Sequence, residues 1–95
     1  MLDNILIGRY ALSKAGHDSG KWYVIIETER EYVYLVDGKI RTIDRPKKKK
    51  MKHVNITKQF DPELVEKIMN KTVRNEEIKR ALKLFQDRDS SKEVV

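Results

Sequence analysis

The sequence contains no cysteine. This absence excludes disulfide bonds, thiolate zinc sites and cysteine nucleophiles, and it agrees with a reducing compartment, so we expect a cytoplasmic protein. Histidine is scarce as well. His17 and His53 lie far apart in the sequence with no acid or thiol at metal-ligand spacing, and we therefore expect no metal and no cofactor.

Long apolar runs are also missing. The first ten residues hold only a brief apolar patch between Asp3 and Arg9, and no run approaches the roughly 20 residues that cross a bilayer. We therefore expect no signal peptide and no membrane association.

Patterns typical of catalysis are missing too. No phosphate-binding glycine loop, paired carboxylate or arrangement of Ser, His and Asp stands out. The chain is 39% hydrophobic and 38% charged over 95 residues, which leaves little interior for a deep pocket. We expect neither an enzyme nor a small-molecule substrate.

Positive charge is present in excess, and it is concentrated in the front of the chain. Residues 1–60 hold 13 basic and 7 acidic residues, whereas residues 61–95 hold 8 of each, so the front segment carries the whole net charge of +6. Between Lys39 and Lys58 the only acid is Asp44. Self-repulsion of this kind favours a polyanionic partner.

Alternation of apolar and polar residues predicts five short strands, over residues 9–14, 22–26, 31–36, 39–43 and 52–56. Asp37 and Gly38 predict a tight hairpin between the third and fourth strands. Residues 44–50 include Pro46 and four lysines, and we expect a solvated loop because neither a core nor a regular ladder would hold them. Five strands that each bury one face predict a small closed or nearly closed barrel.

The period then changes to that of helices. Phe60, Asp61 and Pro62 predict one helix start and Asn75 a second, with apolar residues at helical spacing after each. The two helices could form a hairpin that closes through residues 71–74. We expect a barrel over residues 1–58, a two-helix extension over residues 59–87 and a flexible tail over residues 88–95.

The stretch between the first two expected strands forms a glycine turn, residues 14–21. Gly16 and Gly20 lie on either side of Asp18 and allow the positive φ that a chain reversal needs. Lys14 and Lys21 flank the turn, and with exposed backbone amides they suit a phosphate backbone. An unspecialised β-turn is the alternative interpretation.

The basic run from Arg45 to Lys52 is the largest chemical signal. Lysine supplies a mobile charge without the geometry to read bases, so the run predicts affinity for nucleic-acid phosphates. Roughly five phosphate contacts would give a slope of about −4 when the logarithm of the binding constant is plotted against the logarithm of the salt concentration, the log–log salt slope. Replacement of Lys47–Lys50 by alanine is expected to weaken this binding with little change in melting temperature. A solvated arm without a partner, a nuclear-import signal and a contact to anionic lipid are the alternatives.

Several aromatic residues fall in the expected strands. Core packing is the default for such residues, and Trp22 shares a face with Val24 and Ile26. Tyr23 and Tyr34 are the candidates for stacking on unpaired bases.

A family resemblance adds to this interpretation. The stretch from Gly8 to Glu27 resembles the KOW motif of ribosomal proteins and transcription elongation factors, with Gly20 at its central glycine and Asp18 just before it. The front segment, loosely through Val54, resembles the fourteen-e-type proteins of the archaeal and eukaryotic large ribosomal subunit. The resemblance rests on Gly8, Arg9, Gly16, Gly20, Val24 and Ile25. It implies an SH3-like barrel that binds structured RNA, with ribosomal RNA or a pre-ribosomal particle as the expected partner.

The sequence therefore predicts a mainly β protein, a small five-stranded SH3-like barrel with a C-terminal helical extension, that binds RNA as a monomer. One continuous footprint requires the lysines and the glycine turn to share a surface that the helices leave open. The predicted RNA-binding residues are Lys14, Gly16, His17, Gly20, Lys21, Arg41, Arg45, Lys47, Lys48, Lys49, Lys50, Lys52 and His53. The alternative function is a protein-interaction module, in which the helical extension docks a transcription or translation partner such as polymerase or a ribosomal protein, with Leu84 outside its main apolar stripe.

Overall fold

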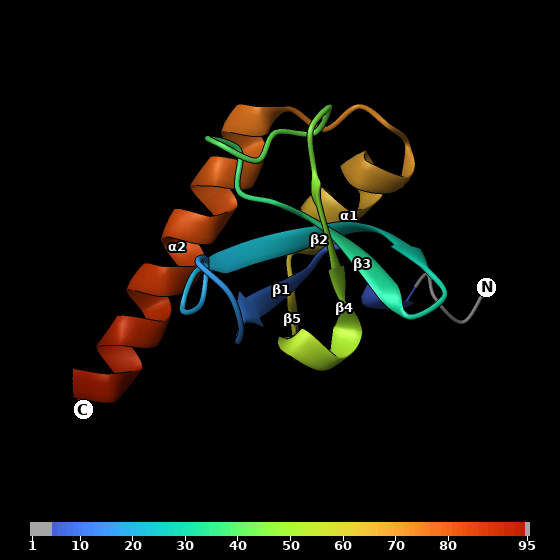
Figure 1. Ribbon diagram of the computed structural model, residues 1–95. Helices are drawn as coiled ribbons and strands as arrows, with labels where there is room; N and C mark the ends of the chain where they lie inside the picture. Colours follow the sequence, from blue (N-terminus) through green and yellow to red (C-terminus); the bar gives the residue numbers. More distant parts are fainter. Residues whose placement is uncertain (1–4, 95) are drawn as a thin grey trace.

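The computed structural model describes residues 5–94, and side chains over residues 5–88. Five strands and two helices follow one another along the chain (Figure 1). The strands are β1 (Arg9–Ser13), β2 (Trp22–Glu29), β3 (Tyr32–Val36), β4 (Lys47–Lys50) and β5 (Val54–Phe60). A single 3₁₀ turn, η2 (Met51–His53), joins β4 to β5. The helices are α1 (Pro62–Met69) and α2 (Asn75–Val94).

The strands form one antiparallel sheet in the order β4-β3-β2-β1-β5. The sheet is open, because β4 and β5 are its two edges and share no ladder. Register shifts between Arg9 and Ala11 and between Ile25 and Glu27 interrupt the regular pairing of the strands. The predicted class, a mainly β fold with a C-terminal helix, is confirmed, and the sheet is compatible with a small SH3-like barrel.

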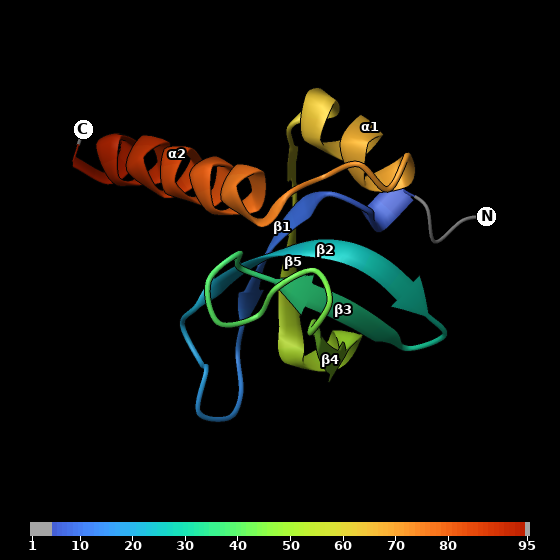
Figure 2. The same cartoon turned by 90° about the horizontal axis from the view of Figure 1, so that it is seen from above.

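Both faces of the sheet are apolar, and each belongs to a separate part of the core. One face buries a cluster of strand residues, namely Ala11, Tyr23, Ile25, Val33, Leu35 and Val54. The other face, with Tyr10, Val24 and Val36, packs against buried residues of the helices such as Ile78 and Phe85. Figure 2 shows α1 and α2 on the same side of the sheet. The helices therefore complete the core instead of standing apart from it.

The helix starts predicted from the sequence are confirmed. Asp61 caps α1, since its Oδ1 accepts a hydrogen bond from the backbone N–H of Glu63 at 3.0 Å, and Pro62 occupies the first turn. An ion pair between Lys67 and Glu77 joins the two helices. The helix α2 continues through Val94 and so passes beyond residue 87, while the flexibility expected for residues 88–95 stays a prediction.

The predicted hairpin and return strand over residues 39–43 are wrong. Gly38 has the expected positive φ of 81°, but the carboxylate of Asp37 accepts the backbone N–H groups of Lys39, Ile40 and Arg41. The backbone N–H of Ile43 donates to Asn75 Oδ1 at 2.9 Å, which ties the segment to the start of α2. Side chains satisfy these backbone groups, so the segment needs no ladder.

The predicted solvated lysine loop is also wrong, because Lys47–Lys50 is the strand β4. It pairs with β3, with Lys47 opposite Leu35 and Lys49 opposite Val33. A ladder holds these lysines because alternate side chains point to opposite faces of the sheet and find different surroundings. Lysines on an edge strand also discourage pairing with another chain.

Substitution of Gly38 tests the contact between this segment and α2. A Cβ at Gly38 would lie 2.4 Å from the backbone oxygen of Asn75, whereas a Cβ at Gly20, which also has a positive φ of 89°, meets nothing within 4 Å. Gly20→Ala is expected to lower the free energy of unfolding by about 1 kcal/mol, the cost of the backbone conformation alone. Gly38→Ala is expected to cost about 1–3 kcal/mol more because of the overlap. Urea unfolding measures both, and equal losses would contradict the close packing.

Candidate nucleic-acid interface

The glycine turn is formed as expected, but several of its backbone N–H groups are already engaged in hydrogen bonds to backbone carbonyl oxygens. Gly16 and Gly20 have φ of 86° and 89°, and both are exposed. The backbone N–H groups of Ser19, Gly20 and Lys21 donate to carbonyl oxygens within the turn and at the end of β1, at 2.8–3.2 Å. The prediction of bare amides is therefore wrong for these three groups. Exposed side chains and the two glycines contribute to the open surface of the turn.

A buried carboxylate, Asp18, holds the turn together, with only 6% of its surface exposed. Its Oδ1 accepts hydrogen bonds from Ser13 Oγ at 2.9 Å and Lys49 Nζ at 2.7 Å. Its Oδ2 lies 3.0 Å from Lys47 Nζ. Tyr23 donates its hydroxyl hydrogen to the same oxygen at 3.4 Å.

The surroundings of Asp18 and Tyr23 change the pKa values of both side chains. Burial by itself would raise the pKa of Asp18, but the hydrogen bonds from Lys49, Lys47 and Ser13 outweigh it and hold the pKa well below its usual range. Burial, followed by the negative charge of Asp18, raises the pKa of Tyr23 to about 12. Asp18 is therefore an ionised, paired carboxylate at neutral pH.

Lys49 closes the turn onto β4, since its Nζ also donates to Ser13 Oγ at 2.8 Å and to the backbone oxygen of Ala15. The side chains of Lys47 and Lys49 are only 27% and 10% exposed. The two lysines and the glycine turn share one surface, and the exposure of Gly16 and Gly20 means that the helices leave it open. However, Lys47 and Lys49 neutralise Asp18, so they position the turn and are not free to hold phosphates.

Lys48 and Lys50 alternate with these two residues and point to the opposite face of β4. Lys48 Nζ lies 4.6 Å from the ring centroid of Tyr32, 5.9 Å from that of Tyr34 and 3.6 Å from the carboxylate of Glu29. The charge interactions with Tyr34 and then Glu29 raise the pKa of Lys48. Lys50 pairs with Tyr32 across the ladder and is partly exposed.

The two tyrosines named as candidates for base stacking lie in different environments. Tyr34 is partly exposed and donates its hydroxyl hydrogen to Glu29 at 2.6 Å, a bond that lowers the pKa of Glu29. Tyr23 is 3% exposed within the core, so the prediction that it stacks on bases is wrong. Stacking on Tyr34 stays a prediction.

Exposed basic side chains surround the turn, and we call five of them the turn cluster. The turn cluster consists of Lys14, His17, Lys21, Lys52 and His53. All five side chains are exposed, and none is in an ion pair with an acid among the described side chains. The backbone N–H of Lys14 donates to the carbonyl oxygen of His53 at 2.9 Å, which places η2 beside the turn. These residues come from separate parts of the sequence and meet at one end of the sheet.

Arg41 and Arg45 lie on the segment between β3 and β4. Arg41 is partly buried and Arg45 is exposed. Among the side chains of residues 5–88, no hydrogen bond or ion pair joins either guanidinium to the turn. Their place in one footprint with the turn cluster stays a prediction.

Sequence reasoning missed the partnership of Asp18 with Ser13, Lys47 and Lys49. The available signal was the spacing of two between the two lysines, which places them on one face of a strand. Four adjacent lysines indicate a loop instead, and a loop has no such alternation.

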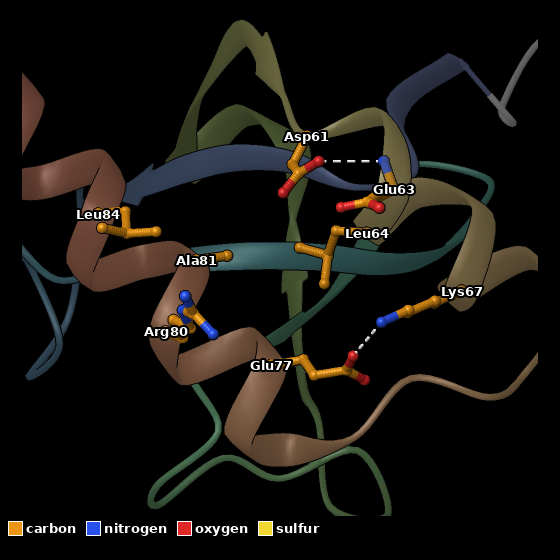
Figure 3. A pocket seen from close by; sticks show the side chains of 8 residues that line it. All are labelled: Asp61, Glu63, Leu64, Lys67, Glu77, Arg80, Ala81 and Leu84. Carbon is orange, nitrogen blue, oxygen red and sulfur yellow. Dashed lines mark hydrogen bonds and ion pairs between the residues drawn. The ribbon is translucent and has the colours of Figure 1, made fainter.

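A second surface lies between the helices, where a cleft of ≈ 300 Å³ separates α1 from α2 (Figure 3). One ion pair, between Lys67 and Glu77, crosses it. Leu84 lines this cleft and also a neighbouring one that includes Phe60, and both side chains are about half exposed. This helical surface is therefore mixed, with paired charges beside two exposed apolar residues.

No group of His, Asp or Glu that could hold a metal ion occurs in the described part of the chain. Within residues 5–94, no helix has the length and apolar character needed to cross a membrane. No protein-family model matches the chain, and no curated protein matches it either.

Proposed function

We propose that the protein binds structured RNA, ribosomal or pre-ribosomal, through the turn cluster and the two exposed glycines of the turn. The observation that carries this proposal is the convergence of the turn, η2 and the lysines of β4 at one end of the sheet. The excess of positive charge in residues 1–60 and the resemblance of residues 8–27 to the KOW motif support it. The absence of cysteine accords with a cytoplasmic site of action.

The buried ion pairs have a clear role in such a function. An ionised Asp18 inside the turn would repel phosphate, but Lys47 and Lys49 neutralise it. The same contacts hold the turn to β4, so the turn cluster stays in one arrangement before RNA arrives. Gly16 and Gly20 carry no side chains, which allows a phosphate backbone to come close to the main chain.

RNA titrations at several salt concentrations test the proposal. The intact protein is expected to bind an RNA hairpin with a log–log salt slope of about −3 to −4, as four phosphate contacts would give. A DNA hairpin of the same sequence serves as the comparison, because a surface that fits A-form RNA discriminates against it. No binding at low salt, or binding without salt dependence, would contradict the proposal.

The alternative of a protein-docking module is favoured by one observation, the half-exposed Phe60 and Leu84 beside α2. Truncation at residue 61 does not test it, because the helices bury the outer face of the sheet. The variant Leu84→Asp is the sharper test, since it changes only this surface. If docking is the function, the variant loses a ribosomal-protein or polymerase partner while RNA binding remains.

A further inference from the structure

A third cleft opens between the glycine turn, the loop after β3 and α2, and its volume is ≈ 520 Å³. In Figure 1 these three segments are the light-blue turn, the green loop and the orange helix. Gly20 and Lys21 contribute the turn side, Lys39 and Ile40 the loop side, and Lys79 and Lys83 the helix side. The volume lies within the range of about 300–1,000 Å³ that is typical of ligand sites.

The cleft is basic although the helical half of the chain has no net charge. Lys79 and Lys83 are four residues apart, which places them on one face of α2. With Lys21 and Lys39 they give four exposed lysines around the cleft, none of them in an ion pair with an acid among the side chains of residues 5–88.

Two carboxylates also line this cleft. Asp37 is one of them, and its Oδ1 accepts three backbone N–H groups of its own loop. Asp87 is the other. Four lysines against two acids leave the cleft positive, which matches an anionic ligand.

Apolar surface lies between these charges. Ile40 is 75% exposed, and Trp22 lines the cleft as a partly buried side chain. The Trp22 ring packs edge-to-face on Phe85, with ring centroids 4.8 Å apart and an interplanar angle of 73°. A ring fixed in this way can receive a base, while the surrounding lysines reach phosphates on either side of it.

We propose that this cleft binds an unpaired stretch of RNA that continues from the structured RNA held at the turn cluster. The inference rests on the proposed function and adds a ligand class to it. Lys21 belongs both to the turn cluster and to the cleft, so one RNA strand can pass from the first site to the second. An acidic peptide would use the lysines but leave the Trp22 ring without a role.

Trp22 is the only tryptophan in the sequence, so its fluorescence reports on the cleft directly. The probe is a short oligouridine, which has no stable secondary structure, and a blunt RNA hairpin is titrated separately. The test variant is Lys79→Gln with Lys83→Gln. The matched control is Arg80→Gln with Arg88→Gln, which removes two charges from parts of the same helix that line the other clefts.

Oligouridine is expected to quench Trp22, and the test variant is expected to bind it about tenfold more weakly. Its log–log salt slope should be less steep by about 1.4, since two single-strand phosphate contacts are lost. The control variant should change the affinity by less than about twofold. Equal losses in both variants, or binding without a change in Trp22 fluorescence, would overturn the proposal.

Two further results separate the possible failures. If oligoglutamate binds as tightly as oligouridine and quenches Trp22 equally, the cleft takes acidic peptides and the proposal is overturned. If the hairpin binds the intact protein but oligouridine does not, the cleft proposal fails while the proposed function stands. If neither RNA binds, both fail.

Discussion

The double variant Lys47→Ala with Lys49→Ala is expected to lose about 3–5 kcal/mol of unfolding free energy, as is typical when a buried ion pair loses one partner. The reason is that Asp18 would stay buried without a cation, because Lys47 and Lys49 are its two ion-pair partners among the described side chains. The bonds from Lys49 to Ser13 and Ala15 would disappear as well, so the turn would lose its attachment to β4. Urea unfolding measures the loss.

The matched control is Lys48→Ala with Lys50→Ala, which makes the same change on the opposite face of the same strand. Lys48 contacts the exposed Glu29 and the partly exposed Tyr32 and Tyr34, so its removal should leave the melting temperature nearly unchanged. The sequence predicts that all four lysines can be replaced at little cost, whereas the structure predicts this only for the outward pair, Lys48 and Lys50. Equal destabilisation by the two double variants would refute the ion-pair arrangement.

The pH dependence gives an independent check. The folded protein holds the pKa of Asp18 below its unfolded value of about 3.9, so the stabilisation is present above that value and is lost as pH falls through the folded pKa. Stability of the native sequence should therefore decrease below about pH 4. Without the two lysines, the hydrogen bond from Ser13 is left to oppose the effect of burial, which raises the pKa of Asp18, so the loss of stability below about pH 4 is expected to be smaller. Melting temperatures across this range distinguish the two proteins, and parallel profiles would argue against the buried pair.

The triple variant Lys14→Ala, Lys21→Ala and Lys52→Ala is expected to bind an RNA hairpin on the order of 100-fold more weakly at low salt. Its log–log salt slope should be less steep by about 3, roughly one unit for each lost phosphate contact. The melting temperature should not change, because these side chains are exposed and have no acidic partner among the described residues. Fluorescence anisotropy of a labelled hairpin measures the affinity.

The control for this variant removes three exposed cations elsewhere, by alanine at Lys58, Lys71 and Arg74. Net charge falls by the same amount, so a general electrostatic attraction would weaken equally in both variants. We expect less than about a fivefold loss for the control. A comparable loss in both would mean that binding depends on overall charge and not on the turn cluster.

Features of the fold that depend on neighbouring residues were predictable from the sequence. The cap at Asp61, the proline after it and the start at Asn75 define helix ends within a few positions of the chain. The alternation in Tyr32–Val36 likewise marks β3 without any knowledge of its partners. Such local signals give the element order and the mainly β class.

The segment between β3 and β4 could not be predicted, because distant partners decide its conformation. Gly38 does have the positive φ that a turn needs, but the backbone after it bonds to Asn75, 32 positions from Ile43. The lysines of β4 stay in a ladder because Asp18, 31 positions before Lys49, neutralises two of them. No local window contains either partner.

The candidate site was predictable in part for the same reason. The glycine turn and its flanking cations Lys14 and Lys21 are local, and the structure places them as expected. Which of the four lysines contact Asp18 depends on the alternation of side chains between the two faces of a strand. A segment that is predicted as a loop has no such alternation. The sequence did not indicate Lys79 and Lys83 as site residues, because residues 61–95 contain equal numbers of acidic and basic residues and carry no net charge.

Ultraviolet crosslinking in cells, followed by sequencing of the bound RNA and mapping of the crosslinked peptides, tests the proposed function most directly. We predict crosslinks from ribosomal or pre-ribosomal RNA to residues 14–22 and 50–53, around the turn cluster. Recovery of no RNA, or crosslinks confined to α1 and the far side of α2, would contradict it.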